Sequence, residues 1–216
     1  MTNFQQLMTE TEYERNEFAT IPALVRGAQG QISLTSYIAF LTEAYHHVKH
    51  TIPLLMSCGS RLPERLEWLR EAVGEYIEEE MGHQEWILND IRACGGDAEA
   101  VRNGSPSAET EIMVAYAYDT IQRNNPVGFF GMVLVLEGTS IRLATTAAQK
   151  IQQSLNLPKE AFSYLTSHGE LDVSHMSFYE KLVNRIEEKA DQTAVIHTAH
   201  MMYRLYGDIF RALPLD

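Results

Sequence analysis

The sequence predicts an all-α fold in which a single domain, residues 1–216, holds about seven helices. Apolar residues recur along the chain with the 3.6-residue period of an amphipathic helix. No segment keeps for long the period of two that a half-buried strand requires. A chain of 216 residues can bury one substantial core, and no internal repeat, low-complexity segment or linker divides it.

The chain is expected to open with one or two short helices between residues 3 and 29, interrupted near Pro22 and closed by Gly27 and Gly30. A long helix then begins near Ser33, because serine is a favoured N-cap residue. It continues through SYIAFLTEAYHHVKHTIPLLMS, where Pro53 kinks it or ends its regular part.

The middle of the chain is predicted to hold one continuous helix from Pro63 to Ala93. Proline is favoured in a first turn, and Gly95 and Gly96 are a C-cap signal. Residues 97–108 are predicted to form a loop.

The C-terminal half is predicted to hold the remaining helices. A helix over residues 109–123 stops at an Asn-Asn-Pro sequence, and the apolar helix VGFFGMVLVLEGTSIRLATTAAQK follows. Another helix begins at Pro158, a longer one reaches about Lys189, and Asp191 caps a last helix that ends near Leu213.

The charge balance excludes two classes of partner. With 17 basic and 29 acidic residues the net charge is −12, which attracts neither nucleic acid nor an anionic membrane. No apolar run reaches the roughly 20 residues of a membrane helix, and the opening MTNFQQLMTETEYER does not resemble a signal peptide. Two distant cysteines, Cys58 and Cys94, suit a reducing compartment. We therefore expect a cytoplasmic protein.

The most informative residues are His168, Asp172 and His175, in the sequence SHGELDVSH. Steps of four and three residues place all three on one stripe of a helix. Two imidazoles and a carboxylate on adjacent turns can bind a divalent transition metal. A solvated polar face is the alternative interpretation of this triplet taken alone.

Glu137 is a second candidate, because it is the only charged residue between Pro126 and Ile141. Its helical neighbours are apolar, so its carboxylate is expected to be buried. A buried carboxylate is costly unless it is protonated or meets a cation. The alternative is that this helix presents Glu137 to water.

Two further helices offer matching ligands. Glu43 shares a stripe with His47 and His50, and we take Glu43 as the ligand, with the two histidines as supporting or alternative ligands. In the sequence EEEMGHQEW, Glu80 and His83 form a carboxylate-x-x-His pair one turn apart. His83 is the firmer choice, since a Glu-Glu-Glu run is ordinarily a solvated acidic face.

Together these residues resemble a dinuclear ligand set spread over four helices. Carboxylate-bridged di-iron bundles take one carboxylate from each of two helices and a carboxylate-x-x-His pair from each of two others. Several oxygen donors are needed to offset about four positive charges, while imidazoles fill the remaining positions. The sequence therefore predicts two iron ions, with manganese or a mixed iron–manganese pair as the alternative.

The additional histidine, His168, is foreign to the ferritin-like pattern. With His168-x3-Asp172-x2-His175 the chain resembles the heme-oxygenase-like di-iron oxidases and oxygenases of the TenA/PqqC-like superfamily. The resemblance extends to SYIAFLTEAYHHVKHTIPLL and EEEMGHQEWILNDIRACGGD and covers nearly the whole chain. It implies a heme-oxygenase-like bundle. The implied metal ligands are Glu43, His83, Glu137, His168, Asp172 and His175, with Glu80 as an additional carboxylate.

The resemblance implies an enzyme that uses dioxygen as cosubstrate to oxidise a small fatty-acid-like or amino-acid-like molecule. An external electron donor is an optional partner, and a homodimer is expected. Two alternatives stay open. One is a metal-free PqqC- or TenA-like enzyme, either a cofactorless oxidase or a thiaminase-type hydrolase. The other is a ferritin-like iron-binding protein.

Overall fold

The computed structural model describes the backbone of residues 1–215 and the side chains of residues 1–141, 144–167 and 175–215. Within this part of the chain all regular structure is helical, so the predicted all-α class is confirmed. The helices are α1 (Asn3–Glu10), α2 (Glu12–Ala19), α3 (Pro22–Gln29), α4 (Leu34–Val48), α5 (Thr51–Arg61), α6 (Glu67–Glu80), α7 (His83–Ala93), α8 (Ala98–Asn103), α9 (Ala108–Arg123), α10 (Phe129–Leu155), α11 (Ser163–Asn184) and α12 (Lys189–Ala212). Short 3-10 turns cover Glu64–Leu66, Pro126–Gly128 and Lys159–Phe162.

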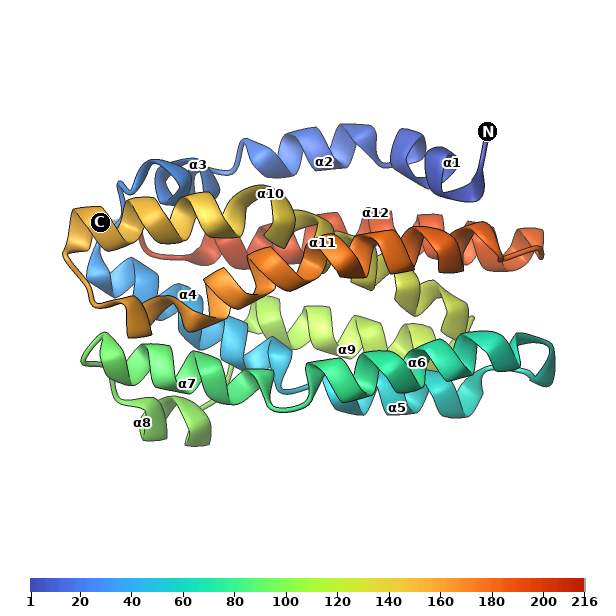
Figure 1. The fold of residues 1–216 in the computed structure, drawn as a ribbon, viewed down its shortest axis with the longest axis horizontal. Helices are drawn as coiled ribbons and strands as arrows, with labels where there is room; N and C mark the ends of the chain where they lie inside the picture. The colour runs from blue at the N-terminus through green and yellow to red at the C-terminus, as the bar shows by residue number, and fades with distance from the viewer. Residues whose placement is uncertain (216) are drawn as a thin grey trace.

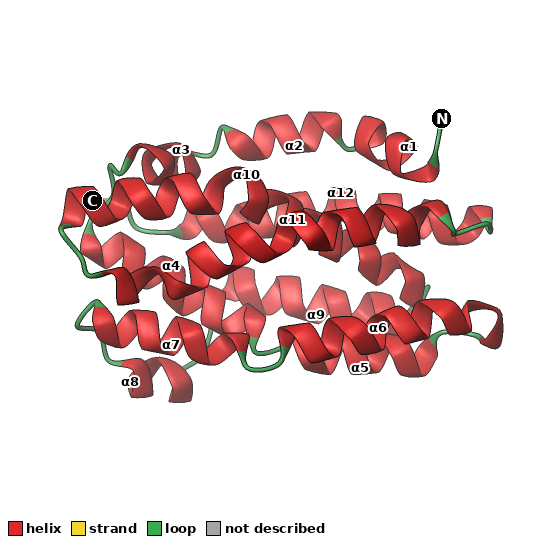
Figure 2. Cartoon of the chain, viewed as in Figure 1, coloured by secondary structure: helices red, strands yellow, loops and turns green. Residues whose placement is uncertain are grey.

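Most helices lie along the long axis of the molecule (Figure 1). The long helix α10 packs against α11, α12 and α3, while α5 packs on α6, α4 on α7 and α9 on α12. Coloured by secondary structure, the chain consists of helices joined by short loops (Figure 2). The longest helices, α10, α11 and α12, thus pack together, while α4 to α7 and α9 form a second group that joins them chiefly through α9 and α7.

The expected number of about seven helices was too low, because several predicted helices are divided. The opening segment contains three helices, and the long helix from Ser33 is broken at Lys49 and His50 into α4 and α5. This break has a physical cause, since Pro53 has no N–H to donate and its ring would clash with the carbonyl four residues earlier, at Lys49. The proline therefore acts one turn upstream of its own position.

The predicted helix from Pro63 to Ala93 is likewise divided into α6 and α7. Gly82 adopts a left-handed conformation with φ of 91°, and the preceding Met81 is extended. Glycine takes this conformation without steric cost. The break makes His83 the first residue of α7 and leaves Glu80 as the last residue of α6.

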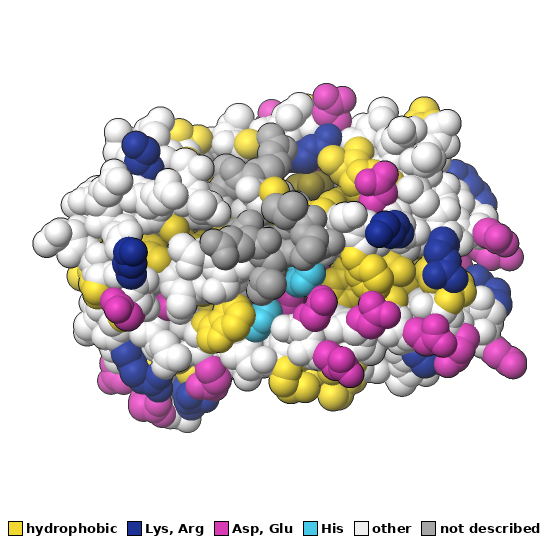
Figure 3. Space-filling view, in the orientation of Figure 1, with side chains coloured by type: hydrophobic (Ala, Val, Ile, Leu, Met, Phe, Trp, Pro, Cys, Tyr) yellow, Lys and Arg dark blue, Asp and Glu magenta, His cyan; other side chains and the backbone are white. Residues whose placement is uncertain are grey.

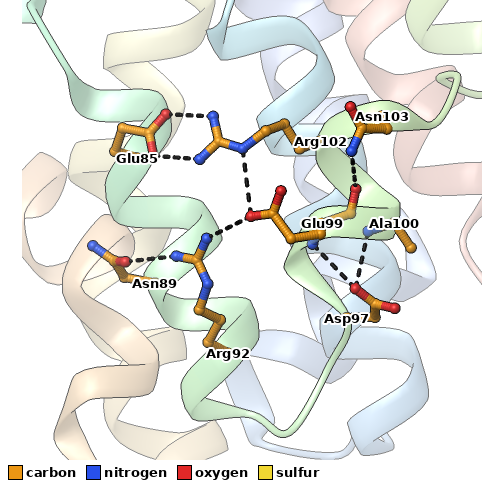
Figure 4. Close-up of polar contacts among 8 residues, drawn as sticks. All are labelled: Glu85, Asn89, Arg92, Asp97, Glu99, Ala100, Arg102 and Asn103. Atoms are coloured by element: carbon orange, nitrogen blue, oxygen red, sulfur yellow. Dashed lines mark hydrogen bonds and ion pairs between the residues drawn. The ribbon is translucent and has the colours of Figure 1, made fainter.

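The predicted loop over residues 97–108 contains the short helix α8, which an ionic network joins to α7 (Figure 4). Asp97 caps α8 by accepting hydrogen bonds from two backbone N–H groups. Arg102 donates two hydrogen bonds of 2.8 and 2.7 Å to Glu85, and Glu99 lies 3.0 Å from Arg92. These pairs are largely solvent-exposed, so they orient α8 more than they stabilise the fold.

The predicted helix caps were correct in one case and wrong in another. Ser33 caps α4, accepting a hydrogen bond from the backbone N–H of Ser36. Asp191 does not cap the last helix, whose N-cap residue is Glu188. Asp191 is buried and instead accepts hydrogen bonds of 2.8 Å from Arg65 and from Asn125. A buried carboxylate with two side-chain donors is worth more to the fold than an exposed cap.

Asp90 on α7 fixes the start of α11. Its buried carboxylate accepts hydrogen bonds from the backbone N–H groups of Ser163 (3.1 Å) and Tyr164 (2.9 Å). These groups belong to the first turn of α11, where helical N–H groups have no partner within the helix. Burial raises the pKa of Asp90, and the hydrogen bonds oppose that shift. The contact sets the position of α11, which carries His175.

Among the residues that the structure describes, no single helix is both long and apolar enough to cross a membrane. The two halves of α10 meet the length and composition criteria only jointly, across a bend of 46°.

Candidate metal centre

Glu80 and His83 form one half of the candidate site, at the junction of α6 and α7. Glu80 Oε2 lies 2.9 Å from His83 Nδ1, and both side chains are almost fully buried. The His83 ring stacks on Trp86, with ring centroids 4.0 Å apart. The i, i+3 spacing predicted this pairing on one continuous helix. In the structure the helix breaks at Gly82, and the imidazole still faces the carboxylate across the break.

Glu137 and His175 form the other half, on α10 and α11. His175 Nδ1 lies 3.7 Å from Glu137 Oε1, and both side chains are buried. His175 Nε2 lies 3.0 Å from Glu79 Oε2, whose side chain is about half exposed. Burial of Glu137 in an apolar helix, which the sequence predicted, is thus observed, and its carboxylate faces an imidazole. Figure 3 shows histidine side chains next to acidic ones near the middle of this face.

Tyr76 connects the two halves, and the sequence pattern gave no sign of it. Its ring packs edge-on against His175, with centroids 6.0 Å apart. Burial, followed by the negative charges of Glu137, Glu79 and Glu80, raises the pKa of the Tyr76 hydroxyl. Tyr76, Glu80 and Glu137 also line the same cavity, so the carboxylates of both pairs face one shared space.

The structure places Glu43 at a different position, at the N-terminus of α9. Its carboxylate accepts hydrogen bonds from the backbone N–H (3.1 Å) and hydroxyl (3.0 Å) of Ser107 and from the hydroxyl of Thr110. A carboxylate at a helix N-terminus satisfies N–H groups and interacts favourably with the helix dipole. This local role accounts for Glu43 without a metal.

The histidines near Glu43 are also separated by the structure. His47 is buried, packs edge-on against Tyr206 and lines the central cavity described below. His50 lies beyond the end of α4, where its Nδ1 is 3.2 Å from the hydroxyl of Tyr118. Burial and the nearby Lys49 lower the pKa of His50. Of the two, only His47 faces the same cavity as Glu80 and Glu137.

The two remaining predicted ligands, His168 and Asp172, lie outside the residues whose side chains are described. Within the described part of the chain, no group of three or more His, Cys, Asp and Glu side chains is arranged to hold a metal ion. The described donors instead come as two carboxylate–imidazole pairs. Oxygen and imidazole donors of this kind suit iron and manganese, so the chemistry of the donor set fits such a centre.

A central cavity of about 180 Å³ adjoins these residues. Glu80 and Glu137 are the only charged side chains among its described lining residues, and Tyr76 and His47 also line it. Most of the wall is aliphatic or aromatic, contributed by α3, α4, α5, α10 and α12. The cavity therefore joins a small acidic region to a long apolar interior, an arrangement typical of sites for small molecules.

Neither cysteine is placed to act as a nucleophile in this cavity. Cys58 and Cys94 are buried and do not line it. Burial raises the pKa of Cys58 to about 12 and that of Cys94 to about 11, so both thiols are protonated near neutral pH.

The sequence of residues 38–207 matches the family model described as iron-containing redox enzymes. This chain belongs to that family. The match spans the candidate residues from Glu43 to His175 and extends through most of the helical bundle. The sequence matches no curated protein.

Solved structures confirm the predicted fold. A domain of unknown function with a heme oxygenase-like fold, from Shewanella denitrificans, superposes with a TM-score of 0.85 at 22% identity, covering 99% of this chain and 92% of the other. A TenA homologue from Pseudomonas syringae gives 0.81 at 11% identity, covering 97% and 90%. Heme oxygenase-1 from the cyanobacterium Synechocystis, in complex with heme, gives 0.76 at 10% identity, covering 99% and 92%.

The solved structures establish the heme-oxygenase-like fold, and the family match establishes the iron-containing redox family. At such low identity the likeness carries fold and not activity, since proteins of one fold can have unrelated functions. Function must therefore be argued from the residues around the cavity.

Proposed function

We propose that this protein is a non-haem di-iron oxidase or oxygenase that activates dioxygen to oxidise a small organic substrate. The observation that carries the proposal is the pairing of Glu80 with His83 and of Glu137 with His175, from four helices, beside one buried cavity. Carboxylates buried among apolar side chains are costly, and a bound cation offsets that cost. Membership of an iron-containing redox family supports the same conclusion.

The donor set that we propose uses Glu80 in the position that the sequence analysis assigned to Glu43. Glu80 lines the cavity and contacts His83, whereas the carboxylate of Glu43 is engaged by Ser107 at the start of α9. The described ligands are then Glu80, His83, Glu137 and His175, and His168 and Asp172 on α11 would complete the set. Iron bound there would supply the electrons that reduce dioxygen.

The surrounding residues hold these donors in place and exclude water. The Trp86 ring fixes the plane of the His83 imidazole, and Glu79 holds the Nε2 side of His175. Partners of this kind orient metal-binding imidazoles. The apolar walls keep a substrate dry next to the carboxylates. They also favour a fatty-acid-like substrate over an amino-acid-like one, because an amino acid would need further charged groups to hold it.

Metal content and oxygen consumption test the proposal. Protein expressed with added iron should hold about two iron ions per chain, and the anaerobically reduced form should consume oxygen when candidate substrates are present. We expect E80Q to lose at least one iron, because an amide is a much weaker ligand for iron than a carboxylate. E43Q is the matched control and should retain both ions.

Well under one iron per chain, with no oxygen uptake, would favour a metal-free enzyme like PqqC or TenA instead. Equal iron loss in E80Q and E43Q would reject the assignment of Glu80 over Glu43. The structure already disfavours a thiaminase-type mechanism, since both cysteines are protonated and lie outside the cavity wall.

A further inference from the structure

We infer that the arm of the cavity between α3 and the C-terminal half of α10 holds an unbranched apolar chain of the substrate, and that the lack of a side chain at Gly27 leaves the arm open to that chain. The inference rests on the proposed site for the position of the polar end only. The arm itself is defined by its walls, which contain no charged side chain among the described residues.

One wall of the arm is a face of α10. Ala144, Ala147 and Ile151 line the cavity at spacings of three and four residues, which places them on one stripe of the helix. From Ala144 to Ile151, beyond the bend of 46° in this helix, the stripe rises about 10 Å, at 1.5 Å per residue. This apolar stripe therefore offers an extended chain a continuous surface to pack against.

Two polar groups of the arm are already engaged by the protein. The Tyr37 hydroxyl donates to the carbonyl of Ala161 at 2.7 Å, and the Ser36 hydroxyl donates to the carbonyl of Pro214 at 2.6 Å. Because these groups have partners, they offer little to a polar ligand. An apolar chain can pack against this wall without breaking these hydrogen bonds.

The far end of the arm is closed by the C-terminal segment. Leu213, Pro214 and Leu215 line the cavity, and Arg26 on α3 donates to the carbonyl of Leu215 at 3.2 Å. In Figure 1 the C-terminus lies next to α3 and the C-terminal end of α10. The segment therefore forms the end wall that a bound chain would meet.

Gly27 faces open space in the opposite wall. It is buried and lines the cavity, yet a Cβ added there would meet no atom within 4 Å. Three residues further on, a Cβ at Gly30 would lie 2.6 Å from the carbonyl oxygen of Lys150 on α10. Gly30 thus allows a close backbone contact between α3 and α10 less than one turn from Gly27. A larger side chain at Gly27 would project into that space.

Binding of 1-alkanols with 6 to 14 carbons to iron-free protein tests the inference, measured by displacement of the neutral dye Nile red. The alcohol can donate to a carboxylate without the charge repulsion that a fatty acid would meet. In wild type the Kd should fall about fourfold per added methylene until the chain fills the arm, and then stop falling. In G27A and G27L that limit should move to shorter chains, by about one and about three carbons.

G74L is the matched control, because Gly74 lies within α6, is exposed and also has no atom within 4 Å of an added Cβ. It should leave the chain-length limit unchanged. G27A should fold at least as well as wild type, since alanine is favoured over glycine in a helix, so the test survives if G27L misfolds. An unchanged limit in G27A and G27L, or no dependence on chain length in wild type, overturns the inference. Alkanol binding is measured on iron-free protein, for wild type and variants alike. Its outcome is therefore independent of the iron content and oxygen uptake that test the proposed function.

Discussion

Three buried tyrosines differ in what their hydroxyl groups contact. Tyr37 donates to the carbonyl of Ala161 and Tyr179 donates to the carbonyl of Phe130, at 2.7 and 2.8 Å. The hydroxyl of Tyr76 is buried and has no hydrogen-bond partner among the described residues. A buried hydroxyl without a partner costs free energy that a paired one does not. Among the described residues, the hydroxyl of Tyr76 therefore lowers the free energy of unfolding of the iron-free protein, next to the candidate metal ligands.

We expect Y76F to raise the free energy of unfolding of iron-free protein by about 1 kcal/mol, because it removes an unsatisfied polar group and keeps the ring. Y37F should lower that free energy by about 1–2 kcal/mol, since it leaves the carbonyl of Ala161 unpaired. Urea denaturation followed by circular dichroism measures both. A Y76F variant that is as destabilised as Y37F would show that the Tyr76 hydroxyl has a structural partner.

At the residue scale, the sequence indicated the candidate ligands whose polar side chains are unusual for their position on a helix. Glu137 stands alone in an apolar helix, and His83 and His175 each follow a carboxylate at helical spacing. Tyr76 could not be found in this way, because a tyrosine in an amphipathic helix is ordinarily a core residue. Glu43 has the same pattern as a ligand, and only tertiary structure reveals that Ser107 and Thr110 engage it.

At the scale of helices, the breaks between helices position the candidate ligands. The break at Gly82 lets α6 and α7 take different directions, so that Glu80 and His83 meet across a turn. Sequence periodicity predicted one helix here because a single glycine within a helical pattern is tolerated and does not by itself mark an end. At α4–α5 the proline signal was visible, but its effect falls one turn earlier than the proline.

Two glycine-to-alanine variants on α6 and at its end should have opposite effects. G82A should lower the free energy of unfolding by about 1–2 kcal/mol, because φ of 91° is unfavourable for alanine. G74A should raise it by up to about 1 kcal/mol, because Gly74 is helical and exposed with space for a Cβ. Chemical denaturation of both variants in parallel is the measurement. If G82A matched G74A in stability, α6 and α7 would have to form a continuous helix.

At the scale of the whole molecule, the fold class and the iron-containing redox family were both predictable from the sequence. Helical periodicity gave the all-α class, and the spacing of His168, Asp172 and His175 led to the heme-oxygenase-like family that the family match and solved structures confirm. The cavity was not predictable, because its wall consists mostly of ordinary aliphatic and aromatic residues that several helices and the C-terminal segment contribute. Such residues carry no chemical signal until they are brought together.

The candidate ligands join helices from both halves of the chain, since α6 and α7 lie before α10 and α11 in sequence. A metal held between them would bind the folded state and not the unfolded one, so it would stabilise the whole bundle. At a free metal concentration of about 100 times Kd the gain is about 2.7 kcal/mol, or an increase in Tm of about 5–10 °C for a chain of this size.

Anaerobic thermal unfolding with and without Fe²⁺ should show this increase in wild type, and Mn²⁺ should give an increase without redox chemistry. The Tm of E137Q is compared with that of its own iron-free form, because the loss of the carboxylate that faces His175 also changes the stability of the iron-free protein. Its increase with Fe²⁺ should be much smaller, because an amide replaces the carboxylate ligand. The same increase in E137Q as in wild type would place the metal elsewhere, away from the contact between α10 and α11.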